Sequence, residues 1–418
     1  MSAASAPSYD TIVIGLGALG AASALQLARR GQRVLGIDRH HPPHDQGSSH
    51  GDSRITRLAV GEGSAYVPLV QRSHALWREI EAHTGAQLLT QTGGLILASR
   101  DCVAAHHGKA DFVRTTMATA RRFGIAHEVL RADEIRARFP QFLLRGDEEA
   151  YFEPEAGFVR PEAAIAAQLQ WAAELGAQLR TGETVTRIEP LGTHEGAGVR
   201  VHTDQGSYLA ARVVLAAGPW VPGLLGAADD AGARAWSAQL RVLRQTLYWF
   251  DTGANAAQYQ PERFPIFIWI FGEREEDYMY GFPTTDAPWP ALKVATEQYA
   301  HTTTPERMER SVPDAEVRAM FESRLRGRFA GLDAQQGRVL KAAACLYTVT
   351  PDRDFLIDRL PGAPQVLLVS ACSGHGFKHS AGLGDAIAEA ITRPDAASPL
   401  LAPFAHARLD GAGPVLAG

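Results

Sequence analysis

Cysteine, excess positive charge and long apolar runs are all scarce in this sequence. Its 418 residues include three cysteines, which are too few and too scattered for a disulfide framework and favour a reducing compartment. The 41 Lys and Arg residues against 46 Asp and Glu residues give a net charge of -5, without the basic excess that nucleic acid binding uses. No stretch approaches the roughly 18 consecutive apolar residues that span a bilayer. The opening MSAASAPSYD lacks the basic and apolar parts of a secretory signal. We therefore expect a cytoplasmic protein that binds neither nucleic acid nor a membrane.

The composition is that of a folded protein with a large core. Hydrophobic residues make up 45% of the chain and charged residues 21%, which excludes a disordered chain. The length exceeds the usual size of one domain. Segments of different character alternate along the chain, which indicates two domains woven from discontinuous segments.

The N-terminal region has the pattern of a dinucleotide-binding unit. The expected order is a strand at 11–14, a helix at 21–30 and a second strand at 32–38 that ends in Asp38. Three glycines lie in the first turn: Gly15, Gly17 and Gly20. Glycines at this spacing let the backbone approach a pyrophosphate, and an acid at the end of the second strand binds a ribose. NAD enzymes begin in the same way, and glycines can also serve only to pack a helix on a strand, so this motif alone does not identify the nucleotide.

Later segments predict further elements. We expect helices at 66–83, 161–176 and 312–329, and strands at 184–188, 199–203 and 208–216. The aromatic block at 241–283 is typical of a sheet that lines a pocket.

Three segments contain arginine, cysteine or lysine side chains that can bind a ligand or take part in a reaction: HGDSRITR at 50–57, AAACLYT at 342–348 and SGHGFK at 373–378. Taken alone, Cys345 is a small buried hydrophobe and Lys378 a surface lysine at a helix start. A lysine there faces the unfavourable end of the helix dipole, so a nearby anion would explain it better. We expect no metal at the histidines of the adjoining loop, whose spacing matches no common ligand pattern: His40, His41, His44 and His50.

Together with VIGLGALG at 13–20, these segments resemble the monomeric sarcosine oxidase and N-methyltryptophan oxidase family of flavin amine oxidases, in order and spacing, from about 9 to 391. The resemblance implies the D-amino acid oxidase-like α/β fold, in which a Rossmann-like FAD-binding domain is interleaved with a substrate domain built on a mixed, largely antiparallel sheet. The implied FAD-binding domain comprises residues 1–88, 155–229 and 338–418. The implied substrate-binding domain comprises residues 89–154 and 230–337.

The resemblance also implies FAD as the cofactor, attached through Cys345 to the 8α-methyl carbon. Arg54 would lie beside the flavin, and Cys372 would only pack in the core. The residues implied in cofactor binding are Gly15, Gly17, Gly20, Asp38, Arg39, Ser53, Arg54, Val185, Gly218, Trp220, Cys345, Gly374, His375, Gly376 and Lys378.

Substrate roles follow from the same resemblance. Arg57 and Lys378 would bind the substrate carboxylate, because a guanidinium grips a carboxylate in two places. Lys293 would favour the reaction of reduced flavin with oxygen, since a fixed cation stabilises developing superoxide. The catalytic residues implied are Lys293, Arg54, Glu297, Tyr280 and Tyr347, although either tyrosine could simply belong to the core.

The chain departs from its relatives at two positions. Related oxidases usually have histidine where this chain has Glu297, and often where it has Ser49. We expect Glu297 to pair with a cationic substrate group. The alternative is a carboxylate directed to solvent by the strand register.

The implied reaction is oxidation of a secondary or primary amine that bears a carboxylate. Hydride passes from the C–H bond next to nitrogen to flavin N5, the imine hydrolyses, and O2 is reduced to hydrogen peroxide. The partners would be a small-molecule amine and O2, and the protein a monomer. Two alternatives stay open: a flavin dehydrogenase that passes electrons to a carrier, and a nucleotide-binding protein without redox chemistry, in which Cys345 is unmodified. The sequence does not identify the amine.

Overall fold

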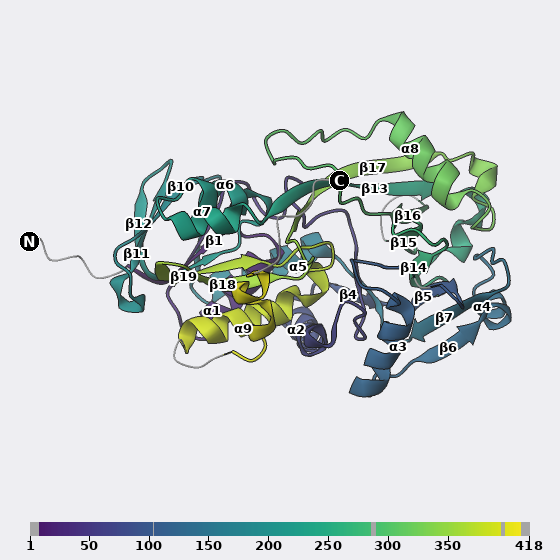
Figure 1. Ribbon diagram of the computed structural model, residues 1–418, viewed down its shortest axis with the longest axis horizontal. Helices are drawn as coiled ribbons and strands as arrows, with labels where there is room; N and C mark the ends of the chain where they lie inside the picture. The colour runs from purple at the N-terminus through teal and green to yellow at the C-terminus, as the bar shows by residue number, and fades with distance from the viewer. Residues whose placement is uncertain (1–7, 103, 286–289, 394–397, 411–418) are drawn as a thin grey trace, which may run out of the picture.

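Two large sheets occupy the two halves of the molecule in this view (Figure 1). The computed structural model describes residues 8–102, 104–285, 290–393 and 398–410. The first sheet contains β10 (Val185–Pro190), β11 (Val199–Thr203), β12 (Ser207–Leu215), β1 (Tyr9–Ile14), β2 (Val34–Asp38) and β9 (Gln178–Thr181) in this order, with β19 (Ala363–Ser370) paired to β12 and β18 (Leu356–Leu360) paired to β19.

This first sheet has a parallel centre. The pairs β1–β2, β1–β12, β2–β9 and β12–β19 are parallel, whereas β10–β11, β11–β12 and β18–β19 are antiparallel. The parallel part arises because α1 (Ala18–Arg29) crosses over between β1 and β2, as the strand, helix and strand of the sequence predict.

Helices cover both faces of the first sheet, because side chains alternate along its buried strands. Val13 and Val34 pack into a core with α1 and α9 (Ser380–Thr392). Ile12 and Leu35 pack into a second core that includes α6 (Val221–Gly226) and α7 (Ala231–Ser237). Helix α1 packs on α9 and on α5 (Pro161–Glu174), and α2 (Val67–Thr84) also packs on α9.

The second sheet is mostly antiparallel. Its order is β17 (Val339–Val349), β13 (Arg241–Asp251), β16 (Ala291–Ala295), β15 (Tyr278–Phe282), β14 (Ile266–Ile270), β5 (Gly94–Ser99), β7 (Glu148–Glu153) and β6 (Glu128–Arg131), and only β14–β5 is parallel. Around it lie α3 (Phe112–Phe123), α4 (Ala132–Arg138) and α8 (Asp314–Met320). A small sheet of β3 (Arg54–Thr56), β8 (Gly157–Val159) and β4 (Leu89–Gln91) completes the architecture.

The two faces of the second sheet have different surroundings. Tyr248 and Phe250 of β13 pack into an aromatic core together with Phe267 and Phe329. On the opposite face, Trp249 packs with residues of β17 in a separate cluster that is close to the N-terminal loops. The predicted aromatic sheet is therefore present, and its second face is the one that meets the functional residues described below.

Some expected elements differ from those in the structure. The helix expected at 312–329 is shorter: α8 is followed by one π-helical turn at Phe321–Leu325, and Gly327 has a left-handed φ of 70° that ends it. The implied domain limits stay a prediction. Strand β17, assigned by that prediction to the FAD-binding domain, pairs along β13 in the second sheet. Across the described residues, no helix has both the length and the apolar content needed to cross a membrane.

Candidate functional site

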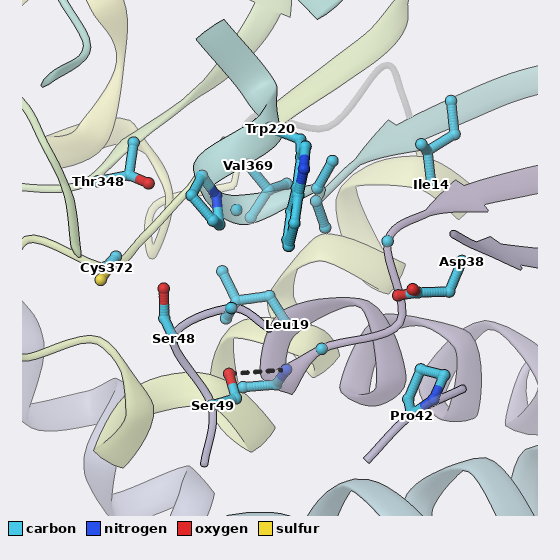
Figure 2. Close-up of a pocket in the computed structure, with 18 of the residues that line it drawn as sticks. Ile14, Leu19, Asp38, Pro42, Ser48, Ser49, Trp220, Thr348, Val369 and Cys372 are labelled. Carbon is cyan, nitrogen blue, oxygen red and sulfur yellow. Dashed lines mark hydrogen bonds between the residues drawn. The ribbon is translucent and has the colours of Figure 1, made fainter. Parts of the chain in front are cut away.

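A cavity of about 330 Å³ lies at the carboxyl ends of the parallel strands of the first sheet (Figure 2). Ile14 ends β1, Asp38 ends β2 and Val369 stands near the end of β19, and all three line the cavity. In open α/β sheets, ligands bind at this edge, where the connections leave a crevice. The cavity is therefore located where the glycine motif predicts a nucleotide.

The turn between β1 and α1 brings backbone segments closer together than side chains would allow. Gly15 has a φ of +87°, and a Cβ there would lie 2.6 Å from the carbonyl oxygen of Ala216. A Cβ on Gly20 would lie 1.7 Å from the carbonyl oxygen of Gly15. Both glycines are needed for the turn to form.

Helix α1 begins at the cavity wall. Gly17 is its N-cap and offers no side-chain cap, while the Ala18 amide donates a hydrogen bond of 3.4 Å to Ser49 Oγ, dashed in Figure 2. All three residues line the cavity. Helix N-termini stabilise anions through free amides and the helix dipole, so this end of the cavity suits a pyrophosphate.

Asp38 is fixed at the end of β2 as an ionised acceptor. Its Oδ2 accepts a hydrogen bond of 2.7 Å from the Leu16 amide, and its Oδ1 accepts one of 2.8 Å from the His40 amide. Burial raises the pKa of this carboxyl, but these hydrogen bonds and His44 outweigh that effect and lower the pKa below its ordinary value. Asp38 is therefore suited to accept hydrogen bonds from a ribose.

Most of the predicted cofactor residues share this cavity. Those that line it are Gly15, Gly17, Asp38, Arg39, Arg54, Val185, Gly218, Trp220, Gly374 and Gly376. Those not in its lining are Gly20, Ser53, Cys345, His375 and Lys378. Cys372, expected only as core packing, also lines the cavity, as do Ser48, which no sequence signal indicated, and Thr348, the last residue of the AAACLYT segment (Figure 2).

Cys345 lies on the face of β17 that leads to the cavity. It is 1% exposed, and it packs in one cluster with Tyr347, two residues along the same strand, and with Cys372. Burial raises the pKa of the Cys345 thiol to about 11. Tyr347 and Cys372 both line the cavity, so the thiol is buried immediately behind its wall.

Lys293 of β16 is buried beneath the 50–57 segment. Its Nζ donates to the carbonyl oxygens of Gly51 and Ser53, both at 2.6 Å, and to Ser53 Oγ at 3.1 Å. Three acceptors match the three protons of an ammonium group. Burial lowers the pKa of Lys293 well below its ordinary value, and the nearby Arg54 lowers it further.

Arg57 and Lys378 meet at one buried carboxylate, Glu62. Arg57 Nη2 lies 2.7 Å from Glu62 Oε2, and Lys378 Nζ lies 3.0 Å from Glu62 Oε1. Burial would raise the pKa of Glu62, yet the two cations hold it well below its ordinary value. Burial lowers the pKa of Lys378 to about 8, against the opposing effect of Glu62. The two implied carboxylate-binding residues are thus brought together, and the sequence reasoning missed Glu62 as their shared partner.

Glu297 is buried, so the alternative of a solvent-directed carboxylate is wrong. Its Oε2 accepts hydrogen bonds from Tyr278 at 2.7 Å and Tyr299 at 2.9 Å, and its Oε1 accepts one from Tyr347 at 3.2 Å. His107 Nε2 lies 2.8 Å from Oε2 and supplies the cation. Burial raises the pKa of Glu297, but His107 lowers it to about 2.

The group of residues around Glu297 adjoins the cofactor cavity. A Cβ on Gly374 would lie 2.9 Å from Glu297 Oε1, and Gly374 and Tyr347 both line the cavity. Tyr280 reaches the same place, with its hydroxyl 3.4 Å from that of Tyr347. Glu297, Tyr280 and Tyr347 therefore come together as implied, although Tyr278 and Tyr299 were not foreseen.

Residues of the types that bind metals cluster around Glu297 and not in the N-terminal loop. Among the residues described, His106, His107 and Glu297 form the group whose ligand atoms lie within 4.8 Å of one another. Both ring nitrogens of His107 already contact carboxylates, Glu297 at 2.8 Å and Glu62 at 3.3 Å. These contacts form an ion-pair network that Arg57 and Lys378 also join.

Comparison with known proteins agrees with this geometry. Residues 10–390 match the protein family described as FAD dependent oxidoreductase. The chain is 40% identical to the monomeric sarcosine oxidase of Streptomyces avermitilis, over 94% of this chain and 96% of that protein. It is 34% identical to the N-methyl-L-tryptophan oxidase of Salmonella arizonae, over 91% of this chain and 94% of that protein.

Solved structures show the same fold. The amino acid oxidase NikD superposes with a TM-score of 0.77 at 24% identity, over 96% of this chain and 98% of that chain. Glycine oxidase from Geobacillus kaustophilus superposes with a TM-score of 0.72 at 20% identity, over 96% and 98%. The family resemblance and the fold class predicted from the sequence are both confirmed. The chain belongs to the FAD dependent oxidoreductase family, among relatives that oxidise N-methyl amino acids.

Proposed function

We propose that this protein is an FAD-dependent oxidase of a secondary or primary amine that carries a carboxylate, with O2 as the electron acceptor. One observation carries the proposal: two buried cations, Arg57 and Lys378, converge on a single carboxylate beside the cofactor cavity. In addition, Arg57 Nε is buried and has no hydrogen-bond partner among the described residues. A buried donor without a partner is costly, and a substrate carboxylate would satisfy it.

The residues present fit FAD. The glycine turn and the start of α1 suit its pyrophosphate, and Asp38 suits its ribose. Arg54 and Gly374 line the cavity at the end where the substrate residues begin. Bound FAD would supply a two-electron acceptor for a C–H bond next to nitrogen, with O2 as the final electron acceptor. We also propose that the protein acts as a monomer, the state named for its sarcosine oxidase relative.

The chain's own residues would bind and orient the amine. Arg57 and Lys378 hold the acid group, and fixing one end of a small substrate lowers the entropic part of the barrier. The ring of Tyr347 is buried and that of Tyr280 is half-buried, and together they would shield the amine end from water. An uncharged amine needs no separate base, so the proton balance is set by the substrate's own pKa.

A peroxide-coupled screen tests this function. We would assay N-methyl, cyclic and basic amino acids, each beside the same amine without its carboxylate. We expect peroxide from the acid of at least one matched pair, and little from the decarboxylated amine of that pair. Flavin that is reduced by the acid without oxygen, yet gives no peroxide in air and passes electrons to a dye, would establish the dehydrogenase instead.

Replacement of Cys345 by serine tests the covalent link. We expect the wild-type protein to show the mass of the polypeptide plus FAD less two hydrogens, which O2 removes as the thioether forms, and to stay yellow after acid precipitation. Cys345→Ser should lose both properties, because a hydroxyl does not replace the thiolate nucleophile. Cys372→Ser is the matched control, since that thiol lines the same cavity. A wild-type mass equal to the bare polypeptide would disprove the link.

A further inference from the structure

His107 lies between β5 and α3, in a turn closed by two backbone hydrogen bonds between His106 and Lys109, of 3.0 and 2.9 Å. Its φ is 52°, a left-handed conformation that is unfavourable for a residue with a Cβ. The Lys109 ammonium, 3.1 Å from an Asp354 carboxylate oxygen, fixes the turn from outside. Such conformations persist where the surrounding structure enforces them.

The His107 ring bridges two carboxylates that are distant in sequence. Nδ1 lies 3.3 Å from Glu62 Oε1 and Nε2 lies 2.8 Å from Glu297 Oε2. With an acceptor on each nitrogen, the ring can donate to both only as an imidazolium. Burial would lower the pKa of His107, but Glu297 and Glu62 raise it to about 9.

The ionisable groups that contact this ring come from several segments: Glu62, His106, Glu297 and His375. Arg57 and Lys378 are connected to it through Glu62. Burial lowers the pKa of His106 and of His375 well below the ordinary value, so both rings are neutral. Outside this group the charges of the turn are paired, as in Arg353 with Glu275.

We infer that His107 is a positioning residue that sets the charge of the substrate site. The inference rests on the proposed function and names the class of ligand that the site accepts. Arg57, Lys378 and His107 carry three positive charges, against two negative charges on Glu62 and Glu297, so the connected network has one net positive charge. A ligand with one net negative charge, such as an amino acid whose amine is uncharged, neutralises it.

His107 also gives Glu62 another partner. An incoming carboxylate competes with Glu62 for Arg57 and Lys378, and a displaced Glu62 keeps its contact with the imidazolium. The cation next to Glu297 is therefore His107 and not a substrate group. This arrangement argues against the expectation that Glu297 selects a basic substrate.

The test uses methoxyacetate, a monoanion with an ether oxygen where the substrate carries its amine nitrogen. Its dissociation constant would be measured at pH 7 from the flavin absorbance change of the holoenzyme. We expect His107→Gln to weaken binding about tenfold, an effect of roughly 1.4 kcal/mol, because the network loses its net charge. We expect the double variant with Glu297→Gln to bind within about threefold of wild type, since it restores that charge.

The matched control is His106→Gln. Its ring stacks on His107 with centroids 4.0 Å apart, and its Nδ1 has no partner among the described residues, so we expect wild-type affinity. Should His107→Gln fail to fold, the dissociation constant of Glu297→Gln alone tests the inference. Its network has two net positive charges, so we expect this variant to bind methoxyacetate more tightly than wild type.

Either of two results with His107→Gln would overturn the inference: the same affinity as His106→Gln, or a double variant that binds no better than His107→Gln. Weaker binding by Glu297→Gln alone would also overturn it. If the inference about His107 is overturned but the wild-type enzyme oxidises acid-bearing amines, the proposed function still stands. A wild-type enzyme that oxidises none of them removes both proposals.

Discussion

Arg57→Ala is expected to lower kcat/KM for an acid-bearing amine by about 100- to 1000-fold, because truncating one partner of a buried charge pair costs about 3–4 kcal/mol. Arg57 is 2% exposed, and its guanidinium already holds one carboxylate oxygen at 2.7 Å. The loss should fall mainly on KM, since the guanidinium binds the same carboxylate before and during the reaction. Steady-state kinetics with an active substrate from the screen measure kcat and KM separately.

Two comparisons separate this role from a structural one. Arg57→Lys keeps the charge but loses bidentate hydrogen bonding to the carboxylate. Its kcat/KM for the acid-bearing amine should therefore lie between those of wild type and Arg57→Ala. The decarboxylated amine should be oxidised equally slowly by all three proteins. Equal losses on both substrates, or a melting temperature and flavin content that fall in parallel with activity, would contradict a carboxylate-binding role.

Lys293→Met is expected to slow the reaction of reduced flavin with O2 by about 100- to 1000-fold, the usual cost of removing one fixed electrostatic contact. Reduction by the substrate without oxygen should change by less than about tenfold. Since burial lowers the pKa of Lys293, its charge is lost earlier than that of an ordinary lysine as pH rises, and reoxidation should slow with it. Stopped-flow measurements of each half-reaction test this.

Lys341 provides the matched control. Both ammonium groups lie against the Trp249 ring, Lys293 at 5.3 Å and Lys341 at 4.5 Å from its centroid. Lys341 is more exposed and pairs with Asp52 at 2.9 Å, so Lys341→Met should leave reoxidation close to that of wild type. If both variants reoxidise normally, the oxygen role of Lys293 is wrong and the dehydrogenase alternative gains ground.

Short-range patterns in the sequence predicted the N-terminal glycine turn, the acid that ends the second strand, and helix α2. The turn at Gly15 and the acid at Asp38 belong to one strand, helix and strand unit that is continuous in the sequence, and the structure has both as expected. The apolar spacing of 66–83 likewise matches α2. The helix expected at 312–329 was too long, because charged residues of good helical propensity continue past the point where Gly327 turns the chain.

The site itself was only half predictable, because its partners come from distant segments. The structure brings Arg57 and Lys378 together at Glu62, although these residues are far apart in the chain, and the substrate role that the family motifs imply for them stays a prediction. Glu62 and His107 carry no comparable signal: each is a common residue in a loop, and its role appears only when the loops meet. The same applies to Glu297, which follows β16 and whose partner His107 comes from a distant loop.

The segment at 51–53 is held from both halves of the molecule. The Gly51 amide donates to Glu162 of α5 at 2.6 Å, while Lys293 of the second sheet takes the carbonyl oxygens of Gly51 and Ser53. Any hinge motion between the halves must therefore pull on the stretch that leads directly into Arg54 and Arg57. Glu162 itself does not line the cavity, although Ile165 of the same helix does. A substitution at position 162 would therefore change how the segment before Arg54 and Arg57 is held while leaving every residue of the cavity wall in place.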